Sequence, residues 1–426
     1  MKSFWELIDF KYFLGTKQIW LYAYVAVYLL YALTAGIEDP LLAVSIIIFA
    51  FAPLRPAFLM FVFYLLWEYV TTFSFGLTAV LTMQVIMIIK IFVQGKGVFK
   101  SKTLLQKKAL SLQTALLIYI AIMGLASFVL YQGFTGISFI FKIVATFYVI
   151  SFWDDEDSAS KAVQSMFHIL MISSLVATIY GFSHETGLER WLSEMGDYVT
   201  QFYGTLGTTR MALFYLVGMA YFLYYVKNVI VKYAGVLLFT VLVLMTVSLT
   251  ALILYVVVVL IYIYSLGKLR KGLLYLLIVA VLAVASFPIW SSSSYVKPLL
   301  YRISYSMDSY EQGDVDAALS GRENLTEYYT NAFEESNMAT KIFGNARSAM
   351  SATGNDMNSH NTFIDILFFF GILGLVLLAL YQIKKVRLIW GQSYFFPLLT
   401  LKTIFLLGAA SVSIMSSTYF VFLIFV

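Results

Sequence analysis

The stretch 361–382 reads NTFIDILFFFGILGLVLLALYQ and contains a single charged residue, Asp365. A helix needs about 20 predominantly apolar residues to cross the hydrocarbon core of a bilayer, and this stretch has that length. It therefore predicts a membrane-spanning helix.

The composition of the whole chain favours the same class of protein. Of the 426 residues, 61% are hydrophobic and 12% are charged, about half of the ~25% that is charged in an ordinary soluble domain. The absence of Cys excludes a disulfide framework, a Cys-ligated metal centre and thiol catalysis. The 28 Lys and Arg are spread along the chain rather than gathered in a stripe, so the net charge of +5 does not indicate a nucleic-acid partner.

Apolar segments of roughly the length of 361–382 recur along the sequence. The fold class predicted is therefore an all-α, polytopic integral membrane protein with about 12–14 transmembrane helices. The runs 233–266 and 394–426 leave an alternative open, since each could form either a helical hairpin or one tilted span. The predicted segments are 18–36, 40–54, 56–71, 74–94, 109–131, 134–153, 162–182, 210–226, 231–248, 250–266, 272–290, 361–382, 394–411 and 413–426.

The distribution of Lys and Arg predicts how these segments are oriented. Positively charged residues collect on the cytoplasmic side of membrane proteins. With a cytoplasmic N-terminus, most of the Lys and Arg fall on the inner side, including Lys227, Lys232, Lys384, Lys385 and Arg387. Both termini are then predicted to be cytoplasmic.

Two outer loops divide the chain into three regions. Residues 1–290 are predicted to hold eleven transmembrane helices and a smaller outer loop at 183–209, residues 291–360 a large extracytoplasmic loop, and residues 361–426 the C-terminal helices. Apolar residues at helical spacing predict an amphipathic helix from Glu323 to Asn337, and a second interfacial helix in the smaller loop. The residues that carry these patterns are Leu325, Tyr328, Tyr329, Ala332 and Phe333 in the large loop, and Trp191, Met195, Tyr198 and Phe202 in the smaller one.

The large loop and the helix after it contain an ordered set of short motifs. Ser320-Gly321-Arg322 is followed by Tyr328-Tyr329, then by Gly344, and then by His360-Asn361 before the glycine-punctuated helix. This order, over about 60 residues, resembles the bacterial O-antigen polymerase and O-antigen ligase family. The resemblance implies glycosyl transfer from an oligosaccharide linked to a polyprenyl pyrophosphate, on the outer face of the bacterial cytoplasmic membrane. It also implies that no metal or other cofactor takes part, and that a flippase and a chain-length regulator are possible partners besides membrane lipid.

The chemistry of the motif residues is compatible with this reaction. Departure of a polyprenyl pyrophosphate places negative charge on phosphate oxygens, which arginine stabilises through paired, charge-assisted hydrogen bonds. Arg322 is the first candidate for this role, with Arg210 and Arg347 as further pyrophosphate ligands. The alternative for Arg322 is that it caps or packs its helix, and for Arg210 that it is an interfacial arginine.

Three further residues complete the predicted site. His360 is a candidate general base for the attacking sugar hydroxyl, or it merely caps the helix together with Asn361. Asp365 could orient His360 or pair with Lys402 in a neighbouring span. Lys142 could supply positive charge to the pyrophosphate, or it pairs with Glu68 or reaches outward to the membrane surface.

The sequence also departs from the family pattern. The usual Asn-Pro-Asn is absent after the glycine-rich stretch that precedes Arg210, and residues 246–250, TVSLT, stand where many relatives have Ser-Arg. These departures favour a polymerase of surface polysaccharide over a ligase, which would use the same donor with a different acceptor. A flippase for lipid-linked oligosaccharides is the alternative from a different functional class, although the two halves of the chain show no repeat.

Overall fold

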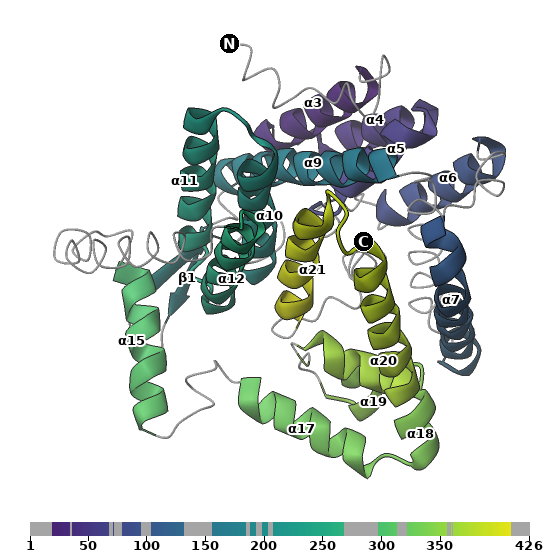
Figure 1. Cartoon of the computed structure of the whole chain (residues 1–426). Helices are drawn as coiled ribbons and strands as arrows, with labels where there is room; N and C mark the ends of the chain where they lie inside the picture. The colour runs from purple at the N-terminus through teal and green to yellow at the C-terminus, as the bar shows by residue number, and fades with distance from the viewer. Residues whose placement is uncertain are drawn as a thin grey trace.

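The computed structural model describes residues 19–34, 36–67, 71, 79–94, 104–131, 156–184, 188–192, 198–202, 208–267, 297–312, 322–355, 359 and 361–409. Within these ranges the regular secondary structure is helical except for one pair of short strands (Figure 1). In chain order the elements are α3 (Ile19–Leu33), α4 (Glu38–Phe51), α5 (Leu54–Tyr64), α6 (Ala79–Gln94), α7 (Leu104–Tyr131), α9 (Glu156–Ser183), β1 (Leu188–Leu192), β2 (Tyr198–Phe202), α10 (Thr208–Tyr225), α11 (Val229–Met245), α12 (Leu249–Ser265), α15 (Lys297–Glu311), α17 (Arg322–Glu335), α18 (Met338–Phe343), α19 (Ala349–Thr353), α20 (Thr362–Ile389) and α21 (Phe395–Ala409).

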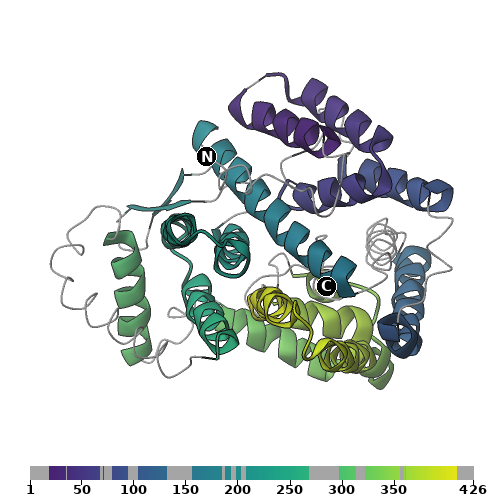
Figure 2. The ribbon, with the colours of Figure 1, turned by 45° about the horizontal axis from the view of Figure 1, so that its top comes forward.

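Helix α9 lies at the centre of the molecule. Figure 2 shows it running between the group α3–α6 and the group formed by α10–α12, α20 and α21. On one side, Ser173 donates to the carbonyl oxygen of Phe63 in α5 at 2.7 Å, and Trp67 donates to Ser173 at 3.2 Å. On the other side, the Thr178 and Tyr215 hydroxyls are 2.8 Å apart and join α9 to α10. These bonds satisfy hydroxyl groups that the apolar helices would otherwise bury at a cost.

Helices α11 and α12 both pack against α10. Gly218 of α10 faces the ring of Phe239 in α11, and Gly235 of α11 faces the ring of Phe222 in α10. Small residues thus let these two helices approach closely. The run 233–266, for which the sequence left a hairpin or a single span open, is divided into two helices, because Ser248 caps the start of α12 by accepting a hydrogen bond from the backbone of Ala251.

Contacts between α10 and α21 define two ends of the molecule. Tyr224 lies 2.9 Å from Thr400 through their hydroxyls, whereas Leu213 packs against Gly408, so the two helices are antiparallel. The turn that contains Lys227 is therefore at the same end as the start of α21, and Arg210 is at the opposite end. The sequence predicted the same alternation of direction for these segments.

Eleven of the fourteen predicted apolar segments coincide with described helices, namely α3–α7, α9–α12, α20 and α21, and the other three lie outside the described residues. Among the described residues, two helical stretches are long and apolar enough to cross a membrane, Ala159–Ser183 in α9 and Thr362–Ile389 in α20. Other apolar helices, such as α3, α11, α12 and α21, are shorter.

The prediction of a helix in the smaller loop, 183–209, is wrong. Residues 188–192 and 198–202 form an antiparallel hairpin, with Leu188 opposite Phe202 and Leu192 opposite Tyr198. The strands contain aromatic and β-branched residues such as Trp191 and Val199, whose strand preference outweighs the helical spacing that the prediction used.

The helix predicted at Glu323–Asn337 in the large loop is confirmed as α17, within a residue or two at each end. Its apolar face is narrower than predicted. Tyr329 and Phe333 are buried and Leu325 and Ala332 are partly buried, but Tyr328 is 45% exposed.

The antiparallel arrangement of α10 and α21 can be tested by cross-linking, since the chain has no native Cys. We expect Leu213→Cys with Gly408→Cys to form a disulfide on mild oxidation, because Leu213 side-chain atoms lie about 2.7 Å from the position of a Cβ at Gly408 and disulfides need Cα atoms within ~7 Å. The control pair Leu213→Cys with Thr400→Cys should stay reduced. Mass spectrometry of non-reduced peptides gives the readout, and cross-linking of the control pair alone would contradict this arrangement.

Candidate functional site

Helix α20 is interrupted at Gly371, where φ is 65° and ψ is −174°. The interruption frees carbonyl groups of the preceding turn, and other parts of the chain donate to them. The backbone N–H of Asn345 donates to the oxygen of Phe368 at 2.8 Å, and that of Ala346 donates to the oxygen of Phe369 at 3.2 Å. A break in an apolar helix is tolerated where neighbouring groups satisfy the backbone in this way.

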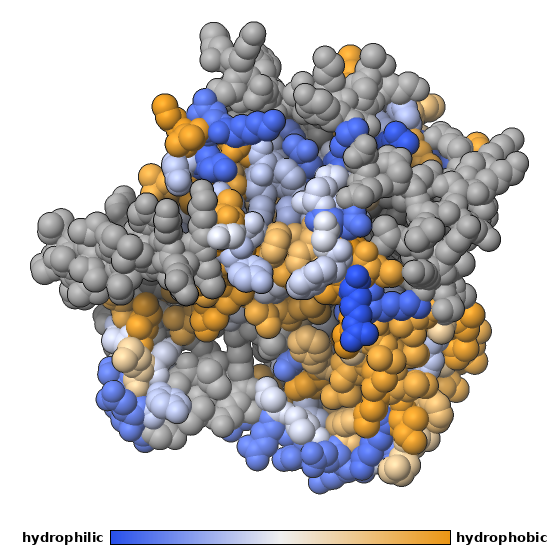
Figure 3. All heavy atoms as spheres, viewed as in Figure 1, coloured by the Kyte–Doolittle hydropathy of each residue, from blue (hydrophilic) through white to orange (hydrophobic). Residues whose placement is uncertain are grey.

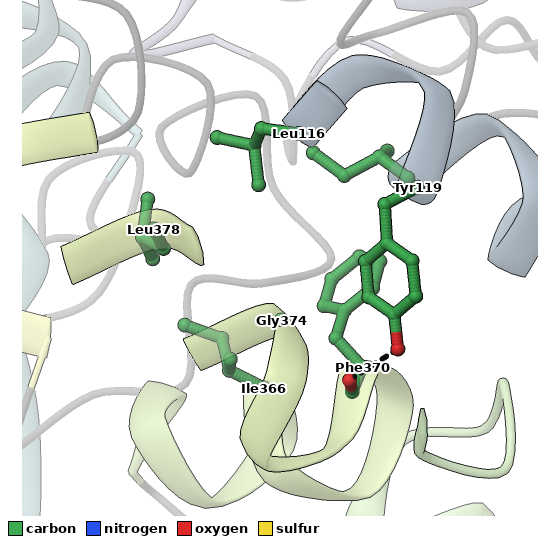
Figure 4. A pocket seen from close by; sticks show the side chains of 7 residues that line it. Leu116, Tyr119, Ile366, Phe370, Gly374 and Leu378 are labelled. Atoms are coloured by element: carbon green, nitrogen blue, oxygen red, sulfur yellow. Dashed lines mark hydrogen bonds between the residues drawn. The ribbon is translucent and has the colours of Figure 1, made fainter. Parts of the chain in front are cut away.

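Tyr119 of α7 satisfies the third carbonyl at the break. Its hydroxyl lies 2.7 Å from the oxygen of Phe370 and also 2.7 Å from that of Phe343, at the end of α18. Figure 4 shows the Tyr119 ring reaching from α7 to Phe370, beside a small apolar pocket lined by Leu116, Ile366, Gly374 and Leu378. One side chain therefore joins α7, α18 and α20.

Two glycines make the crossing of these backbones possible. Gly344 has φ 77° and Gly371 has φ 65°, values that L side chains rarely adopt. A Cβ on Gly344 would overlap the carbonyl of Phe369, and a Cβ on Gly371 would overlap the backbone of Gly344 and Ile342. Both glycines belong to the motif order in the sequence, and the structure brings them into direct contact.

A small core of its own holds α17, α19 and the first half of α20 together. Tyr329 and Phe333 of α17 pack against Phe368 with ring centroids 6.3 and 5.5 Å apart, and Ala349 of α19 is fully buried beside them. We call α17, α18, α19 and residues Thr362–Phe370 of α20 the loop unit. In Figure 1 it lies at the lower end of the molecule.

Asp365 is inside the loop unit and is 2% exposed. Its carboxylate accepts a hydrogen bond from the backbone N–H of Ala349, the first residue of α19, at 3.3 Å. Burial raises the pKa of Tyr329, a hydrogen bond with Thr353 opposes that change, and the nearby negative charge of Asp365 raises the pKa further. Asp365 thus helps to position α19 on α20.

The sequence suggested an ion pair between Asp365 and Lys402 as an alternative role for Asp365, and this alternative is wrong. Lys402 donates to Oε1 of Gln382 at 2.6 Å. Gln382 is on the second half of α20, beyond the break at Gly371, whereas Asp365 is on the first half. The length of α20 therefore separates the two charges.

The loop unit also contains two of the predicted arginines. Arg322 is the first residue of α17. Arg347 follows Ala346, whose φ of 59° turns the chain, and is half-buried in the segment that crosses the break in α20. The backbone N–H of Arg347 donates to Oδ1 of Asn345 at 3.0 Å. The structure thus brings Arg322, Arg347 and Asp365 onto one packed unit.

Arg210 is placed on a different pair of helices. It is the third residue of α10, and the preceding Thr209 lies 3.4 Å from Ser248, the cap of α12, through their hydroxyls. Next to this contact, Val247 has a φ of 50°, which is strained for a β-branched residue. Strain of this kind is often found near functional sites.

Arg210 and Arg322 occupy equivalent positions on their helices. Each is in the first turn of its helix, where the helix dipole is positive and a cation is unfavourable. An arginine beside a helix N-terminus instead adds to the attraction for an anion.

The remaining predicted site residues, His360 and Lys142, lie outside the described residues. The residue after His360 is described. Asn361 caps α20, because its side chain accepts from the backbone N–H of Phe363 at 2.9 Å. The capping role that the sequence suggested for Asn361 is confirmed.

Sequence reasoning missed Tyr119, which is one aromatic among many on an apolar segment and carries no local signal of its contact with α20. No protein-family model matches this chain, and no curated protein is significantly similar to it.

The role of the two crossing glycines predicts a difference between alanine variants. Gly354 has φ 70° and open space around it, so Gly354→Ala carries only the backbone strain, ~1–2 kcal/mol. Gly344→Ala and Gly371→Ala add an overlap with backbone atoms, and overpacking costs a further ~1–3 kcal/mol. We expect both to lower the melting temperature of the purified protein in detergent clearly more than Gly354→Ala does. Equal effects of the three variants would show that the backbones do not cross here.

Proposed function

We propose that the chain is a multi-pass membrane protein that transfers sugar from a polyprenyl-pyrophosphate-linked oligosaccharide, polymerising the repeat units of a bacterial surface polysaccharide. The observation that supports this most is the loop unit. Three of the elements whose order in the sequence resembles the O-antigen polymerase and ligase family meet in it or at its edge: Tyr329 in its core, and Gly344 in backbone contact with Gly371 at the break in α20.

The surface of α20 supports the membrane placement. The apolar part of the second half of α20, from Ile372 to Ile383, is about 18 Å long at ~1.5 Å per residue, and Lys384, Lys385 and Arg387 follow it at the cytoplasmic side of the proposed span. Ile372, Val376, Leu380 and Ile383 are all 45–51% exposed along one face of it. Figure 3 shows an apolar surface over α18 and the lower part of α20, with hydrophilic atoms over α17 below it. In this placement the loop unit is extracytoplasmic and Lys227 is cytoplasmic, which is the orientation that the Lys and Arg distribution predicts.

In the proposed reaction, the hydroxyl of the acceptor sugar attacks the anomeric carbon of the donor. The bond from that carbon to the pyrophosphate oxygen breaks, and polyprenyl pyrophosphate leaves with the bonding electrons. His360 accepts the hydroxyl proton. Arg322 and Arg210, each at the positive end of a helix, stabilise the charge on the leaving phosphates, with Arg347 and Lys142 as additional cations. Asp365 acts as a positioning residue, since it is buried and holds α19 through Ala349.

A ligase would use the same donor chemistry and differ in its acceptor. The absence of the Asn-Pro-Asn and Ser-Arg elements is our reason for placing polymerisation first. Both activities leave polyprenyl pyrophosphate as a product, so the same residues would serve either.

A specific observation also favours a second candidate, a flippase for the same lipid-linked oligosaccharide. Secondary transporters commonly bind substrate at interrupted helices, and α20 is interrupted at Gly371. The carbonyls freed at that point accept hydrogen bonds from the N–H groups of Asn345 and Ala346 and from the hydroxyl of Tyr119, however, so the interruption serves to hold the loop unit. Glycosyl transfer therefore remains the first proposal.

The proposal predicts which lipid-linked glycans accumulate in cells in which the gene is deleted. We expect single lipid-linked repeat units to accumulate on the outer face of the membrane, and the wild-type gene to restore long chains. Arg322→Ala and His360→Ala at matched expression should lower the yield of long chains by about 100-fold, as loss of a group that stabilises transition-state charge does in other enzymes. Gel electrophoresis and mass spectrometry of extracted glycans measure the chain length.

Lys341→Ala is the matched control, because Lys341 is a cation of the same loop, at the end of α18, and is not part of the motif order. It should restore long chains. Long chains that stay on lipid in the deletion strain would identify a ligase, and repeat units trapped on the inner face would identify a flippase. Normal glycans in both alanine variants would show that the proposed site is wrong.

A further inference from the structure

A second group of charged residues lies at the end of the molecule opposite to the loop unit. Lys402 of α21 is 4% exposed, and its ammonium group donates to Gln382 of α20 at 2.6 Å. The ammonium of Lys385, one turn further along α20, is 5.8 Å from the centre of the Tyr381 ring and close enough to Lys402 for the two charges to repel. Two lysines therefore share one site between two apolar helices.

This arrangement is costly unless an anion joins it. Taking an ammonium group out of water is unfavourable, and a hydrogen bond to a neutral amide recovers only a small part of that free energy. Within the part of the chain that the structure describes, Lys402 contacts Gln382 and has no carboxylate within ion-pair distance. Lysines buried in membrane helices without such a partner mark sites for ions or charged ligands.

The surroundings indicate which anion would reach the site. Lys384 is half-buried and Arg387 is exposed, so positive charge continues from Lys385 to the surface. Trp390 follows α20 and is 68% exposed, as tryptophans are at the level of lipid headgroups. On the same helix, Ile383 is 51% exposed and presents an apolar face beside the lysines. A ligand with a phosphate head and an apolar tail matches both surfaces.

We propose that Lys402, Lys385 and Gln382 bind the phosphate group of an anionic phospholipid. Basic pockets between transmembrane helices on the cytoplasmic side bind lipid headgroups in this way. Lys402 supplies the buried charge, Lys385 the second charge, and Gln382 fixes the direction of the Lys402 ammonium. The site is separate from the glycosyl-transfer site and does not depend on that function.

The test uses the full-length protein purified in a neutral detergent. Melting temperature is followed by tryptophan fluorescence with phosphatidylglycerol, with phosphatidylcholine, or with inorganic phosphate added. We expect phosphatidylglycerol to raise the melting temperature by about 3–5 °C, the effect of a ligand in roughly 100-fold excess over its Kd on a chain of this size. Phosphatidylcholine, which has no net charge, should have less than a third of that effect.

Lys402→Gln should abolish the shift from phosphatidylglycerol. The control is Lys232→Gln, a cation at the same end of the molecule that donates to the carbonyl of Leu223 at 3.0 Å, and it should keep the full shift. If Lys402→Gln does not fold, Gln382→Ala is measured instead and should reduce the shift by at least half.

Native mass spectrometry of the wild type should show one retained phosphatidylglycerol. If inorganic phosphate raises the melting temperature as much as phosphatidylglycerol does, the site binds phosphate but its ligand is a free anion rather than a lipid. No shift from either, or a full shift in Lys402→Gln or in Gln382→Ala, would overturn the proposal.

Discussion

The contact between the backbones of Gly344 and Gly371 is the constraint on which the loop unit depends. At this point α20 stops being helical, and three of its carbonyls lose their partners within the helix. Each unsatisfied carbonyl would cost several kcal/mol in an apolar environment. The segment after α18 supplies two N–H groups and Tyr119 supplies a hydroxyl. These groups can reach the carbonyls only because neither glycine has a side chain that would keep the backbones apart.

The two halves of α20 therefore lie in different environments. Its first half is buried in the loop unit around Tyr329, and its second half exposes an apolar face.

This division also determines what the charged residues can do. Asp365, on the first half, is held in place by Ala349, while Lys402 and Gln382 meet on the second half. Arg210 and Arg322 each lie in the first turn of a helix, α10 and α17 respectively. In the proposed function, these helix ends and arginines together bind the phosphate groups of the donor.

Much of the helical framework could be predicted from the sequence, because long apolar runs have few alternatives to a helix. The positions and directions of α10, α11, α12, α20 and α21 were predictable in this way. The hairpin at residues 188–202 was not, since five-residue segments with aromatic residues fit helical and strand spacing equally well. The break in α20 was not predictable either, because glycine occurs in intact helices and the partners that stabilise the break, Tyr119 and Asn345, come from distant parts of the chain. The pairing of Lys402 with Gln382 rather than Asp365 follows from the distance between these two residues along α20.

The most direct test of the central claim is turnover by the purified protein in liposomes that carry a polyprenyl-pyrophosphate oligosaccharide on the side that faces the loop unit. Mass spectrometry of the lipid extract measures both the glycan length and the free polyprenyl pyrophosphate. We predict that glycans of two and more repeat units appear together with an equal amount of the free lipid pyrophosphate. Unchanged glycan length, with the oligosaccharide moved to the opposite leaflet, would contradict glycosyl transfer and would show that the chain transports this lipid.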